Sequence, residues 1–378
     1  MRFLRMPSSP THWVERIKRV MSHPKPGFSG WMSQAFLWWL SQPYGMVVAL
    51  RNWAYDRRWF SVTQVAVPVI SVGNLTVGGT GKTPAVMWIS RWFRDKDIRV
   101  SILSRGYGAG EADVNDEAKE MELRLPDVPH LQNPDRIASA QVATEELETQ
   151  LIVLDDAFQH RKIHRDLNIV LIDALLPFGY EHLLPRGLLR EPIRSLRRVD
   201  VVLVTRADQV DSQSLARIRN RVQLYAPKAA WVETEHRPVH LVNHSGETKP
   251  LEWIAGKGVF AFCGLGNPTG FFETLRGLEA HIVERHAFAD HHPYCAQDLT
   301  SLRERAESLE GLDAFICTGK DASKIGVDRL GRTPLWSLQI ELNIRSGREA
   351  LEDRLHEIVL AIMQKDSAHG AEDTAFNP

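Results

Sequence analysis

The sequence predicts an α/β protein in which a parallel sheet is flanked by helices, with a second, smaller α/β lobe and an N-terminal membrane-associated helix. Three features support this prediction. Continuous apolar runs of strand length alternate with segments of helical periodicity, as in a parallel sheet covered on both faces. A glycine-rich turn follows the first of these runs. The residues that precede the turn are rich in tryptophan and arginine.

Residues 1–60 form the predicted N-terminal segment. Two apolar runs, 36–40 and 44–50, are separated by Pro43 and flanked by basic residues. Neither reaches the roughly 18 uninterrupted apolar residues of a spanning helix, and no secretory signal is recognisable. Tryptophan and arginine around a moderately apolar helix are typical of a helix that lies in the membrane interface. The alternative is a helix that packs its tryptophans on the core, but the pair at 38–39 has no obvious partner there.

The main lobe is predicted over residues 61–240. The segment 212–224 has helical spacing, and the expected buried strands are the apolar runs at 65–72, 99–104, 151–154, 167–172 and 201–204. A polar connection near 235–249 leads to the smaller α/β lobe, which is predicted over 250–364. Residues 365–378 are small and polar, which predicts a disordered tail.

The glycine-rich segment is GNLTVGGTGKTP, at residues 73–84. A strand, a glycine-rich turn, a Lys-Thr pair and a helix form the setting in which backbone amides surround phosphate. There Lys82 would reach the terminal phosphates and Thr83 would ligate Mg²⁺. The alternative is a flexible surface turn, but both flanks favour a nucleotide site. The predicted nucleotide-binding residues are Thr76, Val77, Gly78, Gly79, Thr80, Gly81, Lys82 and Thr83.

Carboxylates follow the third apolar run, where Asp155 and Asp156 would stand at the carboxyl edge of the sheet. In a phosphate-loop enzyme one such aspartate holds Mg²⁺, directly or through water, and the sequence does not choose between the two. Further on, the Pro- and Gly-punctuated segment 183–192 carries Arg190 and Glu191. This pair would supply a cation for a transferring phosphate and one more metal carboxylate, unless it belongs to a plain surface loop.

The composition restricts the partners. The formal net charge of the 378 residues is −1, which gives no argument for a nucleic-acid partner. The cysteines at 263, 295 and 317 lie far apart without C-x-x-C spacing. We therefore expect a reducing cytoplasm, no disulfide framework and no zinc site.

Together these motifs resemble one family, the tetraacyldisaccharide 4'-kinases, which phosphorylate a lipid A precursor at the bacterial inner membrane. The resemblance runs from about residue 37 to about residue 324, and Thr76 fits the phosphate loop of this family although a strict phosphate-loop pattern has glycine there. It depends on five motifs in order: SVGNLTVGGTGKTP at 71–84, LSRGYG at 103–108, DDAFQH at 155–160, LPRGLLREP at 184–192 and TGKDA at 318–322.

The resemblance implies a P-loop lipid kinase of lipid A biosynthesis. Such an enzyme transfers the γ-phosphate of ATP, with Mg²⁺, to the 4'-hydroxyl of an acylated glucosamine disaccharide 1-phosphate. Lys82 and Arg190 would neutralise charge on the transferring phosphate. The resemblance also implies a peripheral or monotopic protein at the cytoplasmic face of the inner membrane, whose partners are this lipid and the membrane surface. It does not predict acyl-chain preference or oligomeric state.

The resemblance further assigns the acid–base residues. The family motif Gly-Asp-Glu-Pro corresponds to Asn-Asp-Glu-Ala at 115–118, which makes Asp116 the expected general base. The expected partner of this carboxylate is His291, with His292 as the alternative. Gly319 departs from the family, which tends to carry glutamate at this position.

Two other functions fit the phosphate loop. A nucleotide-driven switch, either an ATPase or a GTPase, would hydrolyse the nucleotide without an acceptor. The segment TRAD at 205–208 faintly resembles the guanine-reading motif of small GTPases, although Arg206 has the wrong chemistry for it. A kinase for another lipid-linked sugar would share the loop but not the later motifs.

Overall fold

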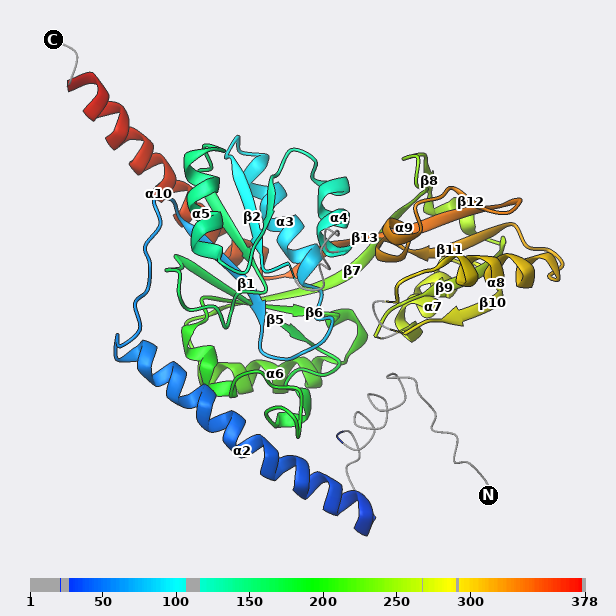
Figure 1. Ribbon diagram of the computed structural model, residues 1–378, viewed down its shortest axis with the longest axis horizontal. Helices are drawn as coiled ribbons and strands as arrows, with labels where there is room; N and C mark the ends of the chain where they lie inside the picture. Colours follow the sequence, from blue (N-terminus) through cyan, green and yellow to red (C-terminus); the bar gives the residue numbers. More distant parts are fainter. Residues whose placement is uncertain (1–20, 22–26, 107–115, 267, 290–291, 376–378) are drawn as a thin grey trace, which may run out of the picture.

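The computed structural model describes residue 21 and residues 27–106, 116–266, 268–289 and 292–375 (Figure 1). Its described strands form one sheet of 13 strands in the order β10-β9-β11-β13-β7-β6-β5-β1-β4-β2-β3, with β12 beside β13 and β8 beside β7. Helices cover both faces, so the predicted α/β fold with its mostly parallel sheet is confirmed.

The elements have the following bounds. The strands are β1 (Val69–Asn74), β2 (Val100–Ser104), β3 (His130–Gln132), β4 (Leu151–Asp155), β5 (Leu167–Asp173), β6 (Val201–Thr205), β7 (Ala230–Val242), β8 (Thr248–Pro250), β9 (Gly258–Cys263), β10 (His281–Ala287), β11 (Ala314–Thr318), β12 (Arg329–Leu330) and β13 (Thr333–Ser346). The helices are α2 (Phe28–Asp56), α3 (Lys82–Arg94), α4 (Asp116–Arg124), α5 (Arg136–Glu145), α6 (Ser212–Gln223), α7 (Pro268–Gly277), α8 (Ala296–Glu307), α9 (Gly319–Ile325) and α10 (Arg348–Ala375).

The main lobe is a sheet of parallel strands buried on both sides, which explains the unbroken apolar runs of the sequence. Every residue of β1, β2, β4 and β6 is buried. Alternate residues point to opposite faces. Ile70 and Leu171 pack in the cluster beneath α3 and α10, whereas Val170 packs with residues of α6 on the other face.

One long antiparallel pair joins the two lobes. Strands β7 and β13 pair from Glu233 and Ser346 at one end to Val242 and Ser337 at the other. At its start β7 pairs with β6 of the main lobe, and the start of β13 pairs with β11 of the smaller lobe. The structure therefore differs from the predicted connection near 235–249, because much of that segment is strand. Its mixed polar and apolar residues match the alternating burial of β7.

The C-terminal helix α10 returns to the main lobe although it follows the smaller lobe in sequence. Leu351, Leu355 and Ile362 are buried in the same cluster as residues of β1 and α3. This position differs from the predicted lobe of 250–364, which included most of this helix. The helix also continues to Ala375, where we expected a disordered tail from residue 365; residues 376–378 lie outside the described part.

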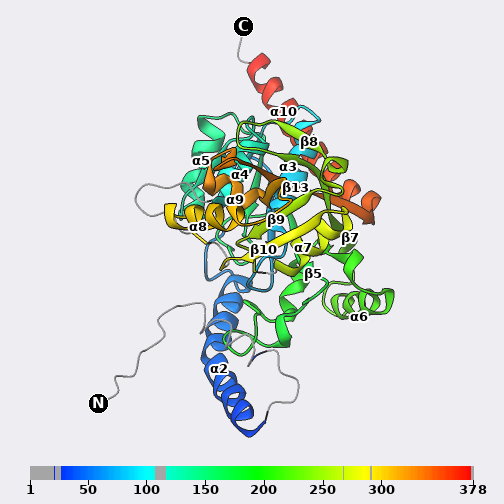
Figure 2. The same cartoon turned by 90° about the vertical axis from the view of Figure 1, so that its right-hand side faces the viewer.

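Helix α2 has 29 residues and continues through Pro43. It projects beyond the main lobe in both views (Figures 1 and 2). In the described part of the chain, no helix is both long enough and apolar enough to cross a membrane.

The position of α10 predicts that the nucleotide lobe depends on it. Leu355 is fully buried and Leu360 of the same helix is 58% exposed. We expect Leu355→Ala to lower the free energy of unfolding by about 2–5 kcal/mol, because it leaves a cavity in the main core. Leu360→Ala is the matched control, and we expect it to change that free energy by less than about 0.5 kcal/mol. Urea unfolding followed by tryptophan fluorescence measures both; equal losses would contradict this packing.

Candidate active site

The glycine-rich segment forms a tight turn between β1 and α3. Gly78 and Gly81 have φ angles of 116° and 85°, which strongly favour glycine. Helix α3 begins at Lys82, and the next residue, Thr83, is buried. The first amides of this helix and its dipole therefore point into the turn, as in an anion-binding site.

Neighbouring residues hold this turn in place. Asn74 donates from Nδ2 to the Thr80 hydroxyl at 2.9 Å, and the Thr205 hydroxyl donates to the Thr80 carbonyl at 2.9 Å. The backbone of the turn pairs with the segment at 188–190: Val77 N donates to Leu188 O at 2.8 Å, and Arg190 N donates to Leu75 O at 2.7 Å. The predicted loop that carries Arg190 is thus bound directly to the phosphate loop.

The predicted acids end strand β4 beside the turn. Asp155 lies in register with Val72 of β1 and is buried, while Asp156 has a left-handed backbone with φ 46°. Both oxygens of Asp156 accept hydrogen bonds from Arg190, at 2.8 and 2.9 Å, and one lies 3.6 Å from Lys82 Nζ. Burial would raise the pKa of Asp156, but Lys82 and Arg190 hold it below its ordinary value. The structure thus brings Lys82, Asp156 and Arg190 together.

The residues present suit Mg²⁺. The Thr83 hydroxyl and the two aspartates offer oxygen donors at the edge of the phosphate loop, and hard oxygen ligands are those that Mg²⁺ prefers. The described residues contain no cluster of three or more His, Cys, Asp or Glu side chains placed to hold a metal. A magnesium ion here would therefore complete its coordination with phosphate oxygens and water, which is its usual behaviour.

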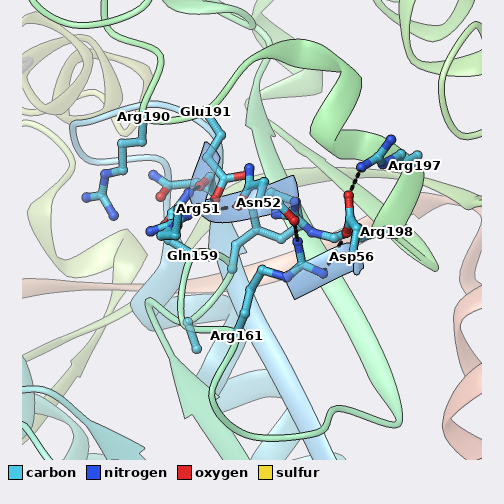
Figure 3. Close-up of polar contacts among 12 residues, drawn as sticks. Arg51, Asn52, Asp56, Gln159, Arg161, Arg190, Glu191, Arg197 and Arg198 are labelled. Carbon is cyan, nitrogen blue, oxygen red and sulfur yellow. Dashed lines mark hydrogen bonds and ion pairs between the residues drawn. The ribbon is translucent and has the colours of Figure 1, made fainter. Parts of the chain in front are cut away.

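Glu191 lies next to Arg190 and has 0% exposure. One carboxylate oxygen accepts from Arg51 at 2.6 Å, and the other accepts from Asn52 at 3.0 Å and from Arg198 at 2.7 Å (Figure 3). Burial would raise the pKa of Glu191, yet Arg198 and Arg51 hold it below its ordinary value. This carboxylate joins α2 to the loop. Its predicted role as a metal ligand, which would require it to leave these donors, stays a prediction.

The predicted acid–base residues differ in how far the structure describes them. Asp116 is the first residue of α4, and its side chain is not described. Helix α4 packs beside α9 of the smaller lobe, and its Arg124 donates to the carbonyl of Ile340 in β13 at 3.0 Å. His291 lies outside the described residues. His292 contacts Asp298 at 3.0 Å and stacks on Phe288.

Two neighbours of the turn, His236 and Arg206, are not among the residues predicted to support it. His236, from β7, lies so close to Gly81 that a Cβ there would be 2.6 Å from its Nε2. Burial, aided by the nearby charge of Arg206, lowers the pKa of His236 to about 4, so the ring is neutral at pH 7. Arg206 itself pairs with Asp173 and donates to the Gly79 carbonyl at 3.1 Å. Arg206 therefore helps to hold the backbone of the turn in place.

Comparisons with known proteins identify the family. The model of the tetraacyldisaccharide-1-P 4'-kinases, LpxK, matches residues 33–360. The chain belongs to this family. A tetraacyldisaccharide 4'-kinase of Anaeromyxobacter sp. (strain K) is 35% identical over 367 residues, which cover 92% of this chain and 97% of that protein. One from Geobacter metallireducens is 36% identical over 311 residues, 77% and 89% of the two chains.

A solved structure agrees. The crystal structure of LpxK from Aquifex aeolicus in complex with ATP has a TM-score of 0.69 and 30% identity, and covers 86% of this chain and 99% of that one. The resemblance predicted from the motifs is thus confirmed. In this LpxK-family chain Gly319 lies beside Gln339 and Glu120: a Cβ there would be 3.2 Å from one and 3.4 Å from the other. A larger residue at 319 would require these side chains to move.

The fit of Gly81 against His236 predicts that this glycine is needed for full nucleotide affinity. Alanine there would combine a positive φ with a clash against the imidazole, so we expect ATP affinity to fall at least ~10-fold, the effect of about 1.4 kcal/mol of strain. Gly277→Ala is the control, since a Cβ there meets open space. Titration with a fluorescent ATP analogue measures both; unchanged affinity in Gly81→Ala would contradict the geometry.

Proposed function

We propose that the protein transfers the γ-phosphate of ATP, with Mg²⁺, to the 4'-hydroxyl of tetraacyldisaccharide 1-phosphate, which yields the 4'-phosphorylated lipid A precursor. The observation that carries the proposal is the convergence of Lys82, Asp156 and Arg190 beside a phosphate loop in a chain of the LpxK family. The relatives are named for this reaction, and the Aquifex LpxK structure contains ATP.

In the proposed reaction the 4'-oxygen of the acceptor forms a bond to the γ-phosphorus while the bond from that phosphorus to the bridging oxygen of ADP breaks. Charge develops on the transferring group, and two preorganised cations, Lys82 and Arg190, stabilise it. Mg²⁺, held by Thr83 and by Asp155 or Asp156, would neutralise the phosphates. Asp116 accepts the proton of the hydroxyl, and His291 or His292 orients this carboxylate. Base catalysis of this kind typically contributes ~10²–10⁴-fold.

The test follows label from γ-labelled ATP and Mg²⁺ onto detergent-dispersed tetraacyldisaccharide 1-phosphate. We expect label on the lipid, and none with Lys82→Ala; Asp116→Ala should lower turnover ~10²–10⁴-fold while nucleotide affinity is kept. Lys96→Ala and Glu122→Ala are the matched controls, because both residues are exposed and lie on or beside the same helices. Release of label as free phosphate only, equally with and without lipid, would contradict the proposal and favour a nucleotide-driven switch.

We also propose that α2 attaches the protein peripherally to the cytoplasmic face of the inner membrane. Its large apolar side chains recur three or four residues apart and so share one face of the helix. They are exposed rather than packed on the core. These exposed residues are Phe28, Trp31, Met32, Phe36, Trp38, Trp39, Met46, Val47, Leu50 and Trp53. An apolar patch of this kind marks a membrane or protein contact.

The opposite face of α2 binds the core through polar side chains and two smaller apolar ones, Val48 and Ala54. Asn52 and Ser41 are buried. The Asp56 carboxylate accepts a hydrogen bond from Arg161 at 2.8 Å and also pairs with Arg197 (Figure 3). Exposed Arg57 and Arg58 follow the helix and would attract anionic headgroups. The large apolar side chains of α2 thus lie on its exposed side, whereas in a surface helix of a water-soluble protein they face the core. This arrangement supports burial of the outer face in the membrane interface.

A matched pair of leucines tests this attachment. Leu50 on α2 is 62% exposed and Leu360 on α10 is 58% exposed. We expect Leu50→Asp to weaken binding to anionic phospholipid vesicles at least ~10-fold, because burying a leucine is worth about 1.5–3 kcal/mol. Leu360→Asp should leave binding unchanged. Vesicle flotation measures both, and equal binding of the two variants would contradict the proposed face.

A further inference from the structure

The inner face of α2 reaches the loop that carries Arg190. The Tyr44 hydroxyl donates to the Arg190 carbonyl at 2.8 Å, across 146 residues of sequence. About two helical turns further on, Arg51 and Asn52 hold Glu191. Two adjacent loop residues are thus bound by one helix face; Figure 3 shows the contacts of the second, Glu191.

Arg190 is constrained from several sides at once. Its amide donates to Leu75 of the phosphate loop at 2.7 Å, its carbonyl accepts from Tyr44, and its guanidinium binds Asp156. The two backbone bonds fix the peptide units on both sides of the Cα. These bonds therefore fix the position of the Arg190 Cα and limit the positions that its guanidinium can reach.

The contact at Glu191 makes docking of α2 and order in the loop depend on each other. A fully buried carboxylate that loses its donors is strongly unfavourable. If α2 moved away, Glu191 would lose Arg51 and Asn52, and Arg190 would lose the hydroxyl on its carbonyl. The docked position of α2 and the conformation of the loop therefore stabilise each other.

We propose that α2 is a positioning element of the phosphoryl-transfer site, and that Tyr44 is the positioning residue that sets Arg190. The proposal is based on the function proposed above for this site. Tyr44 does not touch the reacting atoms; it acts through the backbone of Arg190. Its loss should therefore lower the rate of the chemical step more than it weakens nucleotide binding, because the guanidinium is needed most where charge develops.

The test compares Tyr44→Phe with Tyr55→Phe in phosphoryl transfer. Tyr55 lies about three turns further along α2, and its ring packs on Phe60 and Arg161. We expect Tyr44→Phe to lower kcat ~2–10-fold, as for one hydrogen bond, with little change in the KM for ATP or in Tm. Tyr55→Phe should leave kcat, the KM for ATP and Tm unchanged. A KM effect without a kcat effect, or equal effects of both variants, would overturn the proposal.

A double-mutant cycle tests whether Tyr44 acts through Arg190. In an Arg190→Ala background the further change Tyr44→Phe should have no effect on kcat, since the group that it positions is gone. The same fold loss in both backgrounds would overturn the proposal.

A second measurement does not need turnover. Amide hydrogen exchange of the segment 188–191 should be faster in Tyr44→Phe than in wild type, and unchanged in Tyr55→Phe. Unchanged exchange in Tyr44→Phe would overturn the positioning role. If wild type transferred no phosphate to the lipid, the proposed function would fail, while faster exchange in Tyr44→Phe would still support the positioning of Arg190.

Discussion

The backbone pairing between the phosphate loop and the segment at 188–190 is the constraint on which the site depends. The bonds from Val77 to Leu188 and from Arg190 to Leu75 join two loops that are more than a hundred residues apart in sequence. Either loop alone would be a glycine- or proline-rich turn with many accessible conformations. When the two loops are paired, each restricts the backbone conformations of the other. Arg190 therefore lies beside Lys82 and Asp156.

The gathering of cations around the segment at 188–191 has an electrostatic cost, which the half-buried Asp156 and the buried Glu191 offset. Lys82 and Arg190 share Asp156, and Arg51 and Arg198 share Glu191. Like charges this close repel, and each ion is partly removed from water. Each carboxylate lies between two cations, so it neutralises part of that repulsion. In the proposed reaction, a nucleotide phosphate beside Lys82 and Arg190 would neutralise these cations in place of Asp156, whose carboxylate would then be available to a metal.

Much of the site could be predicted from the sequence, because its groups follow strands. Parallel strands end at one edge, so Asp155 and Asp156 had to lie beside the phosphate loop. The pairing of lobes through β7 and β13 could not be predicted in this way. Periodicity states which face of an element is buried, but not which partner buries it. For the same reason the polar run of β7 resembled a connection, and His236 and Tyr44 carried no signal.

The polar groups on the inner face of α2, which lie there with the apolar Val48 and Ala54, fix how its outer face is oriented. If apolar side chains alone bound α2 to the core, the helix would be apolar all round, which is typical of a fully buried or membrane-spanning helix. Non-directional contacts would also let it rotate about its axis. Hydrogen bonds from Tyr44 and Asn52 are directional, so they fix the rotation at one value. That rotation places the tryptophan-rich stripe outward. Because the same bonds hold Arg190 and Glu191, they connect the proposed membrane-binding face to the phosphate site.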